Sequence, residues 1–201
     1  MKVLVACEFS GIVRDAFIAR GHDALSCDLE PTEREGPHVQ GDVASLLGNG
    51  WDLMIAHPPC TYLTNAGVRH LHSIESSTGK ITKVHGRERA KAMRSATKFF
   101  LLLKEAPIPR ICIENPIPHR YAKDLIGPYD QLVRDWMFGG DESKAICLWL
   151  KNLPKLRDTN VTLGNAHRIH LMSPGPNRAK ERSRFFPGVA AAMAEQWGRL
   201  G

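Results

Sequence analysis

The residue in this sequence whose chemistry is hardest to explain by structure alone is a cysteine that directly follows two prolines. Cys60 ends the segment Ala56-His-Pro-Pro-Cys60, in which the prolines stiffen a loop that leaves an apolar run. A structural thiol is normally buried within an element, so a thiol held in a stiff loop is typical of a nucleophile. A thiolate can add to carbon 6 of a pyrimidine ring, after which carbon 5 can attack an electrophilic methyl group.

An acid that would complete this chemistry follows another apolar run. Glu114 ends Arg110-Ile-Cys-Ile-Glu114 and precedes Asn115 and Pro116. A carboxylic acid that faces ring nitrogen 3 can donate a hydrogen bond there and accept one from the amino group, a pattern that fits cytosine and not uracil or thymine. It can also transfer a proton as the thiol adds. Cys60 and Glu114 are therefore complementary, although Glu114 could instead only cap a turn before Pro116.

Three further positions are suited to a nucleoside cofactor. Gly11 lies where a strand is expected to turn into a helix, and its missing side chain would let a ligand approach the backbone amides, although an ordinary tight turn also fits. Asp28 follows the second apolar run, at the position where nucleotide-binding folds hold ribose hydroxyls. Asp42 could accept a hydrogen bond from an adenine amino group, or it could cap a turn.

The elements that must position these residues follow from the periodicity. Apolar runs of strand length alternate with segments of helical period, which predicts an α/β fold with a mostly parallel sheet and helices on both faces. The polar residues follow these runs, and ligands bind outside the carboxyl ends of such strands. The expected strands are 3–7, 24–28, 52–56, 110–114 and 145–150. The expected helices are 11–20, 87–104 and 189–197.

Composition sets the broad class. The 201 residues, 43% hydrophobic and 24% charged, indicate one soluble domain. No apolar run is long enough to span a membrane and no signal peptide opens the chain, so we expect a cytoplasmic protein. The spacing of the cysteines argues against a disulfide framework and against a zinc site, so no metal is expected. Four of them, Cys7, Cys27, Cys112 and Cys147, are expected to be small buried residues.

The net charge of +6 is unevenly distributed. Residues 66–98 hold eight Lys or Arg against two acids, and residues 151–184 hold the same balance. Two solvated faces would account for this pattern. Clustered positive charge also indicates a surface that binds phosphate, which is the interpretation we favour.

Together these motifs resemble, in order and approximate spacing, those of the cytosine-5 methyltransferase family, and especially its short phage and prophage members. The matching motifs are Phe9-Ser-Gly11, Asp28, Gly41-Asp42, Pro58-Pro-Cys60 and Glu114-Asn-Pro116. The resemblance covers most of the chain. It implies a Rossmann-like, doubly wound methyltransferase fold and S-adenosylmethionine as the cofactor. The segment from Phe186 to Met193 is similar to the family's last motif, a helix that closes the cofactor site.

The resemblance also implies roles for individual residues. The implied cofactor-binding residues are Phe9, Ser10, Gly11, Asp28, Asp42 and Pro58. The implied catalytic residues are Cys60, Glu114 and Asn115, and the substrate-binding residues are Pro59, Thr61, Thr64 and Lys144. Cys60 would attack the ring, Glu114 would bind the cytosine edge, Asp28 would hold the ribose of the cofactor and Asp42 its adenine.

The chain departs from the family at several of these motifs. Cys7 stands where the family has an aspartate, Val13 and Arg14 stand where it has glycines, and Thr61 stands where it has a glutamine. The family's glutamine-arginine motif is not obvious, and Lys144 is expected to take its charged role. Roughly 35 residues separate the last expected strand from the final motif, too few for a target-recognition domain. We therefore expect residues 1–201 to form a single catalytic domain.

The substrate is expected to be cytosine, either in DNA, where the base must flip out of the stack, or in a free deoxycytidine nucleotide. A second interpretation is methylation of the N4 amino group of cytosine or the N6 amino group of adenine. His57-Pro-Pro-Cys60 resembles the Asn/Asp/Ser-Pro-Pro-Tyr/Phe motif of amino methyltransferases, although its first and fourth residues do not fit. A third is a non-catalytic nucleic-acid-binding protein on the same fold.

Overall fold

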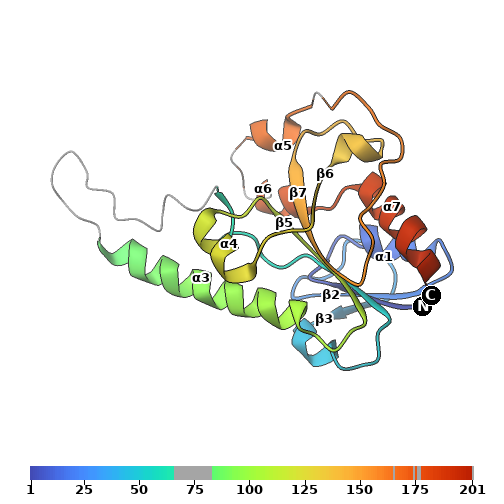
Figure 1. Cartoon of the computed structure of the whole chain (residues 1–201), viewed down its shortest axis with the longest axis horizontal. Helices are drawn as coiled ribbons and strands as arrows, with labels where there is room; N and C mark the ends of the chain where they lie inside the picture. The colour runs from blue at the N-terminus through green and yellow to red at the C-terminus, as the bar shows by residue number, and fades with distance from the viewer. Residues whose placement is uncertain (66–82, 165, 174, 176–177, 201) are drawn as a thin grey trace.

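A computed structural model describes residues 1–65, 83–164, 166–173, 175 and 178–200 (Figure 1). Its centre is a seven-stranded sheet in the order β3-β2-β1-β4-β5-β7-β6. The strands are β1 (Lys2–Ala6), β2 (Asp23–Asp28), β3 (His38–Gln40), β4 (Leu53–Ala56), β5 (Arg110–Pro116), β6 (Gln131–Arg134) and β7 (Ala145–Lys151). β7 pairs antiparallel with β5 and β6, whereas the pairings among β3, β2, β1, β4 and β5 are parallel.

This strand order decides the fold class. The order 3-2-1-4-5 is that of the Rossmann fold, in which the chain reverses direction across the sheet beside β1. β7 lies between β5 and β6 and runs antiparallel to both, so this edge of the sheet is mixed. The predicted α/β class, with its mostly parallel sheet, is confirmed.

Helices cover both faces of the sheet, as predicted. The α-helices are α1 (Ile12–Ile18), α3 (Lys83–Lys104), α4 (Arg120–Ile126), α5 (Arg168–Leu171), α6 (Arg178–Ser183) and α7 (Pro187–Trp197), and short 3₁₀ turns are η1 (Val43–Leu46), η3 (Asp135–Phe138) and η4 (Gly198–Leu200). Alternate residues of β1 point to opposite faces, so Val3 and Val5 pack with α1 and α7, whereas Leu4 and Ala6 pack with α3 and α4.

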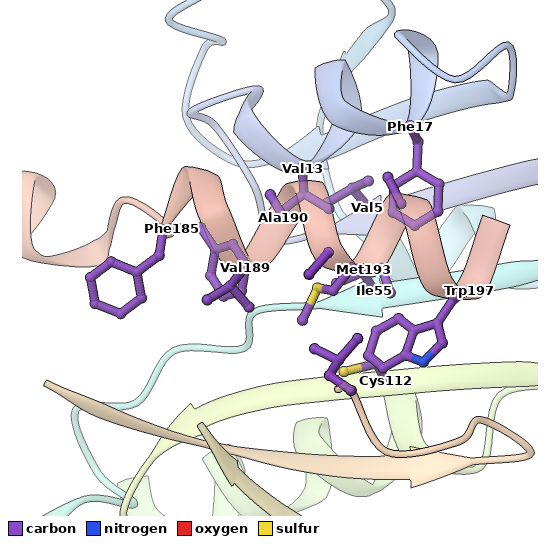
Figure 2. Close-up of a cluster of buried hydrophobic side chains, with 14 of the residues drawn as sticks. Val5, Val13, Phe17, Ile55, Cys112, Phe185, Val189, Ala190, Met193 and Trp197 are labelled. Carbon is purple, nitrogen blue, oxygen red and sulfur yellow. The ribbon is translucent and has the colours of Figure 1, made fainter. Parts of the chain in front are cut away.

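Buried apolar side chains hold α1 and α7 against one face of the sheet (Figure 2). Phe17 of α1 and Met193 and Trp197 of α7 are fully buried over Val5 and Ile55 of the sheet. The indole nitrogen of Trp197 donates to the Pro154 carbonyl at 2.9 Å, which satisfies its polar atom inside the core. The C-terminal helix is therefore an integral part of the core.

The expected elements are present, with shifts of a few residues at their ends, and some elements were missed. β5 continues past Glu114 to Pro116 because β7 pairs with it over that length. β3, β6 and α4 were not predicted, because each is short and carries few buried apolar residues. Within the described residues, no helix combines the length and apolarity needed to cross a membrane.

Candidate functional site

A cleft of about 1650 Å³ runs along the edge of the sheet where the parallel strands end. A pocket for one small molecule typically measures about 300–1,000 Å³, so this cleft has room for two ligands side by side. Most of the predicted site residues line it: Phe9, Ser10, Asp28, Asp42, Pro59, Cys60, Thr61, Thr64 and Lys144. The other predicted residues, Gly11, Pro58, Glu114 and Asn115, are not part of the wall, but each adjoins or bonds a residue that is.

The loop that carries Cys60 is tied to the strands on both sides. The backbone N–H of His57 donates to the Ala6 carbonyl of β1 at 2.9 Å. The side-chain amide of Asn115, on β5, donates to the Pro58 carbonyl at 2.8 Å. After Cys60 the chain turns back, since the N–H of Thr64 donates to the Cys60 carbonyl at 3.2 Å. The nucleophile candidate is therefore held at a fixed position on the cleft wall.

The surroundings of Cys60 determine how readily its thiol ionises. Burial raises the pKa of the Cys60 thiol, and the negative charge of Glu114 raises it further. The positive charges of Lys144 and Arg182 act in the opposite direction. A raised pKa favours the protonated thiol at neutral pH.

Glu114 is bonded to a residue that sequence analysis did not include in the site. The Nδ1 atom of His57 lies 3.1 Å from Oε2 of Glu114, and both side chains are 11% exposed. An ionised carboxylate can only accept, so His57 then donates from Nδ1–H. The ring of His57 packs against Phe185, with centroids 4.7 Å apart, and its Nε2 is buried without a hydrogen-bond partner in the described part of the chain.

Two carboxylates lie at the β3–β2 end of the cleft. Asp28, at the end of β2, accepts from the Glu30 N–H at 2.9 Å through Oδ1. Asp42, after β3, accepts from the Ala44 N–H at 2.9 Å through Oδ1 and so caps η1, which was the alternative considered for it. Each retains its second oxygen for a ligand. In the described part of the chain, no three His, Cys, Asp or Glu side chains gather as a metal site would require.

The N-terminus of α1 is occupied by the protein's own side chains. The Glu8 carboxylate accepts from the N–H groups of Val13 at 2.7 Å and Arg14 at 3.2 Å. Gly11 has φ of +70°, and a Cβ there would lie 2.6 Å from the Arg14 guanidinium. The structure thus explains this glycine by the turn and the close approach of Arg14, and no ligand is needed at these amides.

Arg14, which stands where the family has glycine, is fully buried. Its guanidinium donates to the hydroxyls of Ser26 and Thr32 and to the Glu35 carbonyl, and it pairs with Asp15 at 2.8 Å. These bonds hold the loop that follows Asp28 against the start of α1. The departure from the family thus supports the wall of the cleft.

One of the cysteines expected to be buried is partly exposed. Cys27, Cys112 and Cys147 are buried free thiols, as expected, but Cys7 is only partly buried and lines the cleft. Its φ is +58°, a left-handed conformation that is uncommon for a residue with a side chain. β1 ends at Ala6, and this turn directs the chain into the loop that carries Glu8.

The cleft also contains cations that sequence analysis assigned only to broad basic segments or missed. From residues 151–184 it is lined by Arg178, Lys180 and Arg182, and from residues 66–98 by Arg89. Arg89 donates to the Thr61 carbonyl at 2.8 Å; residues 66–82 lie outside the described residues. Arg134 carried no sequence signal, because it is an isolated cation at the end of the short strand β6.

Comparisons with known proteins add the following. No protein-family model matches the chain, and the search of curated proteins finds no match. Among solved structures, the chain is similar to a protein from E. coli described as a DNA modification methyltransferase encoded within a prophage, with 15% identity and a TM-score of 0.45. The similarity covers 75% of this chain and 46% of the other, so the chain spans about half the length of that protein. The fold assignment rests on the strand order of the chain itself.

The charges around Cys60 lead to a prediction about its reactivity. Because the Glu114 charge raises the pKa of the Cys60 thiol, Glu114→Gln should lower that pKa and speed alkylation of Cys60 by iodoacetamide several-fold at pH 7.5. Lys144→Gln removes a charge that lowers the pKa and should slow alkylation. The rate is measured at Cys60 by peptide mass spectrometry, and Glu30→Gln, an exposed acid of the same cleft, is the control. Equal rates in all four proteins would contradict the proposed electrostatics.

Proposed function

We propose that this protein transfers a methyl group from S-adenosylmethionine to carbon 5 of a cytosine, in DNA or in a deoxycytidine nucleotide, with residues 1–201 acting as one catalytic domain. The observation that carries the proposal is the position of Cys60 and Glu114. The two residues come from loops and strands that are neighbours in the sheet, and the carboxylate acts directly on the pKa of the thiol. Carbon-5 methylation needs this pair of groups beside one ring.

The β3–β2 end of the cleft suits the cofactor. The second oxygen of Asp28 would accept from a ribose hydroxyl and that of Asp42 from the adenine amino group, since the first oxygen of each already has a partner. Phe9 and Ser10 complete this end of the wall. Gly11 and Pro58 lie just behind it, so any effect they have on the cofactor would act through their neighbours. The cofactor would supply the electrophilic methyl group.

The residues of the chain would carry out the remaining steps. Cys60, once it has lost its proton, forms a bond from Sγ to carbon 6, and ring nitrogen 3 takes a proton from Glu114 as electrons move toward it. Carbon 5 would then bond to the methyl carbon as the bond from that carbon to the sulfonium sulfur breaks, which leaves S-adenosylhomocysteine. Loss of the carbon-5 proton to solvent expels the Cys60 thiolate, and nitrogen 3 returns its proton to Glu114. Pro59, Thr61 and Thr64 would contact the ring or its sugar.

His57 would hold Glu114 in the orientation that this sequence of steps needs. Its Nδ1–H occupies Oε2 of Glu114, so the proton that the acid donates would sit on Oε1. Oε2 keeps a second lone pair, which can accept from the cytosine amino group. Asn115 would act indirectly. Its side-chain amide donates to the Pro58 carbonyl and so holds the loop that carries Cys60.

The proposal is tested by methyl transfer. With labelled S-adenosylmethionine and, separately, duplex DNA, single-stranded DNA, deoxycytidine monophosphate and triphosphate, we expect 5-methylcytosine in the digested product of at least one substrate. Cys60→Ala should abolish transfer and change cofactor affinity by no more than a few-fold, because the thiol reacts with the base. Substantial turnover by Cys60→Ala, or a methyl group on N4 or N6, would favour the amino-group interpretation. Absence of cofactor binding would favour a non-catalytic protein.

The assignment of Asp28 predicts a loss of cofactor affinity. A charge-assisted hydrogen bond contributes about 1.5–3 kcal/mol, so Asp28→Ala should weaken S-adenosylmethionine binding roughly ten- to a hundredfold in calorimetry. Glu30→Ala, two residues on and exposed, is the matched control and should leave the affinity close to that of the native protein. The rate at saturating cofactor need not change. Unaltered affinity in Asp28→Ala would exclude the residue from the site.

The Glu114–His57 pair predicts a graded loss of rate. Glu114→Gln keeps the shape but cannot donate the proton, so single-turnover rates should fall about 10²–10⁴-fold while both substrates still bind. His57→Ala should lower the rate less, and His57→Asn, whose amide can donate near the Nδ1 position, should restore much of it. In the Glu114→Gln background, His57→Ala should cost little more. Near-native rates for Glu114→Gln would indicate that the residue only caps a turn.

A further inference from the structure

Apart from Arg89 and from Lys180, which pairs with Glu33 and lies over the Phe9 ring, the cations that line the cleft gather at one end of it. At the β3–β2 end lie Asp28, Glu30 and Asp42. Cys60 follows β4, and Glu114 lies on β5, in the middle of the strand order. At the β7–β6 end lie the cations that we call the cationic end: Arg134, Lys144, Arg178 and Arg182. A ligand that spans the cleft would therefore meet carboxylates at one end and cations at the other.

The four side chains of the cationic end come from three segments that the fold brings together. Arg134 is the last residue of β6 and pairs in register with Ala145, so it lies beside Lys144 at the start of β7. The Nζ of Lys144 donates to the Arg182 carbonyl at 3.2 Å, which joins the C-terminal segment to the same place. Convergence of separate segments shows that the cluster is produced by the fold.

A half-buried charge is normally paired with a group of opposite charge, but these four cations are bonded to backbone carbonyls. Arg134, Arg178 and Arg182 donate to the carbonyls of Ser143, Met172 and Ile169 at 2.6, 2.8 and 3.0 Å. In the part of the chain that the structure describes, none of the four is paired with a carboxylate.

The neighbouring cations of the same segment differ in this respect. Lys180 and Arg184 both pair with Glu33, at 3.3 and 2.9 Å. Carbonyls orient the cations of the cationic end but leave their charge uncompensated, and a partly desolvated charge without a counter-charge is costly. The cationic end is therefore suited to an anion.

The position of the anion relative to the two proposed ligands can be inferred from the place of Cys60 along the cleft. Lys144 and Arg182 line the same cleft as Cys60, and Lys144 directly precedes β7, which is separated from the strand before Cys60 only by β5. Their charges also lower the pKa of the Cys60 thiol. The two carboxylates proposed to hold the cofactor lie at the other end of the strand order. An anion near Cys60 therefore belongs to the molecule that carries the cytosine.

We propose that Arg134, Lys144, Arg178 and Arg182 bind the phosphate of the nucleotide whose cytosine reacts at Cys60. This inference rests on the proposed function and adds to it the residues that hold the phosphate of the substrate. The shared chemistry is a phosphate oxygen held by guanidinium forks and an ammonium group. Its source is either a monoester, in a free nucleotide, or a diester, in DNA.

The test compares ligands with and without phosphate. Arg178→Gln/Arg182→Gln leaves the strands and Lys144 in place, and its fold is checked by thermal unfolding. Affinity for deoxycytidine monophosphate, deoxycytidine triphosphate or DNA should fall about tenfold or more, whereas affinity for deoxycytidine and for S-adenosylmethionine should stay within about twofold. If DNA is the source, the slope of log affinity against log salt should also decrease, by about 0.7–0.9 for each phosphate that the variant no longer neutralises.

A matched control removes two exposed cations from the opposite edge of the sheet. Lys155 and Arg157 follow β7, whose last residue pairs with the start of β5, away from the cleft. Lys155→Gln/Arg157→Gln has the same change in net charge and should bind all these ligands as the native protein does. An equal loss in both double variants would overturn the site, because it would show a general effect of charge.

The other outcomes are equally decisive. If the Arg178→Gln/Arg182→Gln protein binds phosphorylated and unphosphorylated ligands as the native protein does, the inference is wrong even where carbon-5 methylation is observed. If its S-adenosylmethionine affinity falls tenfold, the cations hold the carboxylate of the cofactor and the inference is also wrong. If the phosphate-dependent loss is seen but Cys60→Ala still transfers methyl groups, the phosphate site stands and the proposed mechanism fails.

Discussion

The site depends on how the loop after β4 is fixed to β5. Two side-chain hydrogen bonds join them, from Asn115 to the Pro58 carbonyl at 2.8 Å and between His57 and Glu114 at 3.1 Å. They work as a pair because each links a residue of the proline loop to one of two successive residues of the strand. Together with the bond from the His57 N–H to the Ala6 carbonyl, they define where the stiff proline loop points. These two bonds therefore fix the position of the loop that carries Cys60 relative to Glu114.

The strand order then brings the separate motifs together on one surface, which has carboxylates at one end and cations at the other. Parallel strands place their carboxyl ends at one edge, and the chain reverses direction beside β1, so residues distant in sequence become neighbours. Because β7 is antiparallel, the residue that precedes it lies at the edge where the parallel strands end. That residue is Lys144, so a cation from before a strand is brought to the site. The gradient from carboxylates to cations is a consequence of topology.

Much of this could be predicted from the sequence, and the remainder could not for specific reasons. The strands that hold Cys60 and Glu114 are continuous apolar runs, so the sequence marks them clearly. His57 was considered only as a poor match to the first position of the amino-methyltransferase motif. Its partner Glu114 lies 57 residues further along the chain, and no local sequence pattern predicts such a pair. Arg134 was missed since β6 has few buried residues. The expectation that Cys7 would be buried failed because the chain turns sharply there, with φ of +58°.

Val13 and Arg14, at the start of α1, stand where the family that the sequence resembles has glycines, and the structure explains both together. Glu8 fills the N–H groups at the start of α1, and Arg14 fills the space beside Gly11 and ties down the loop after Asp28. A glycine-rich turn would leave these amides open to a ligand, and here they are already satisfied. The proposed cofactor would therefore have to be held more by side chains than by these backbone amides. The proposal therefore relies mainly on Asp28 and Asp42, which line the same end of the cleft.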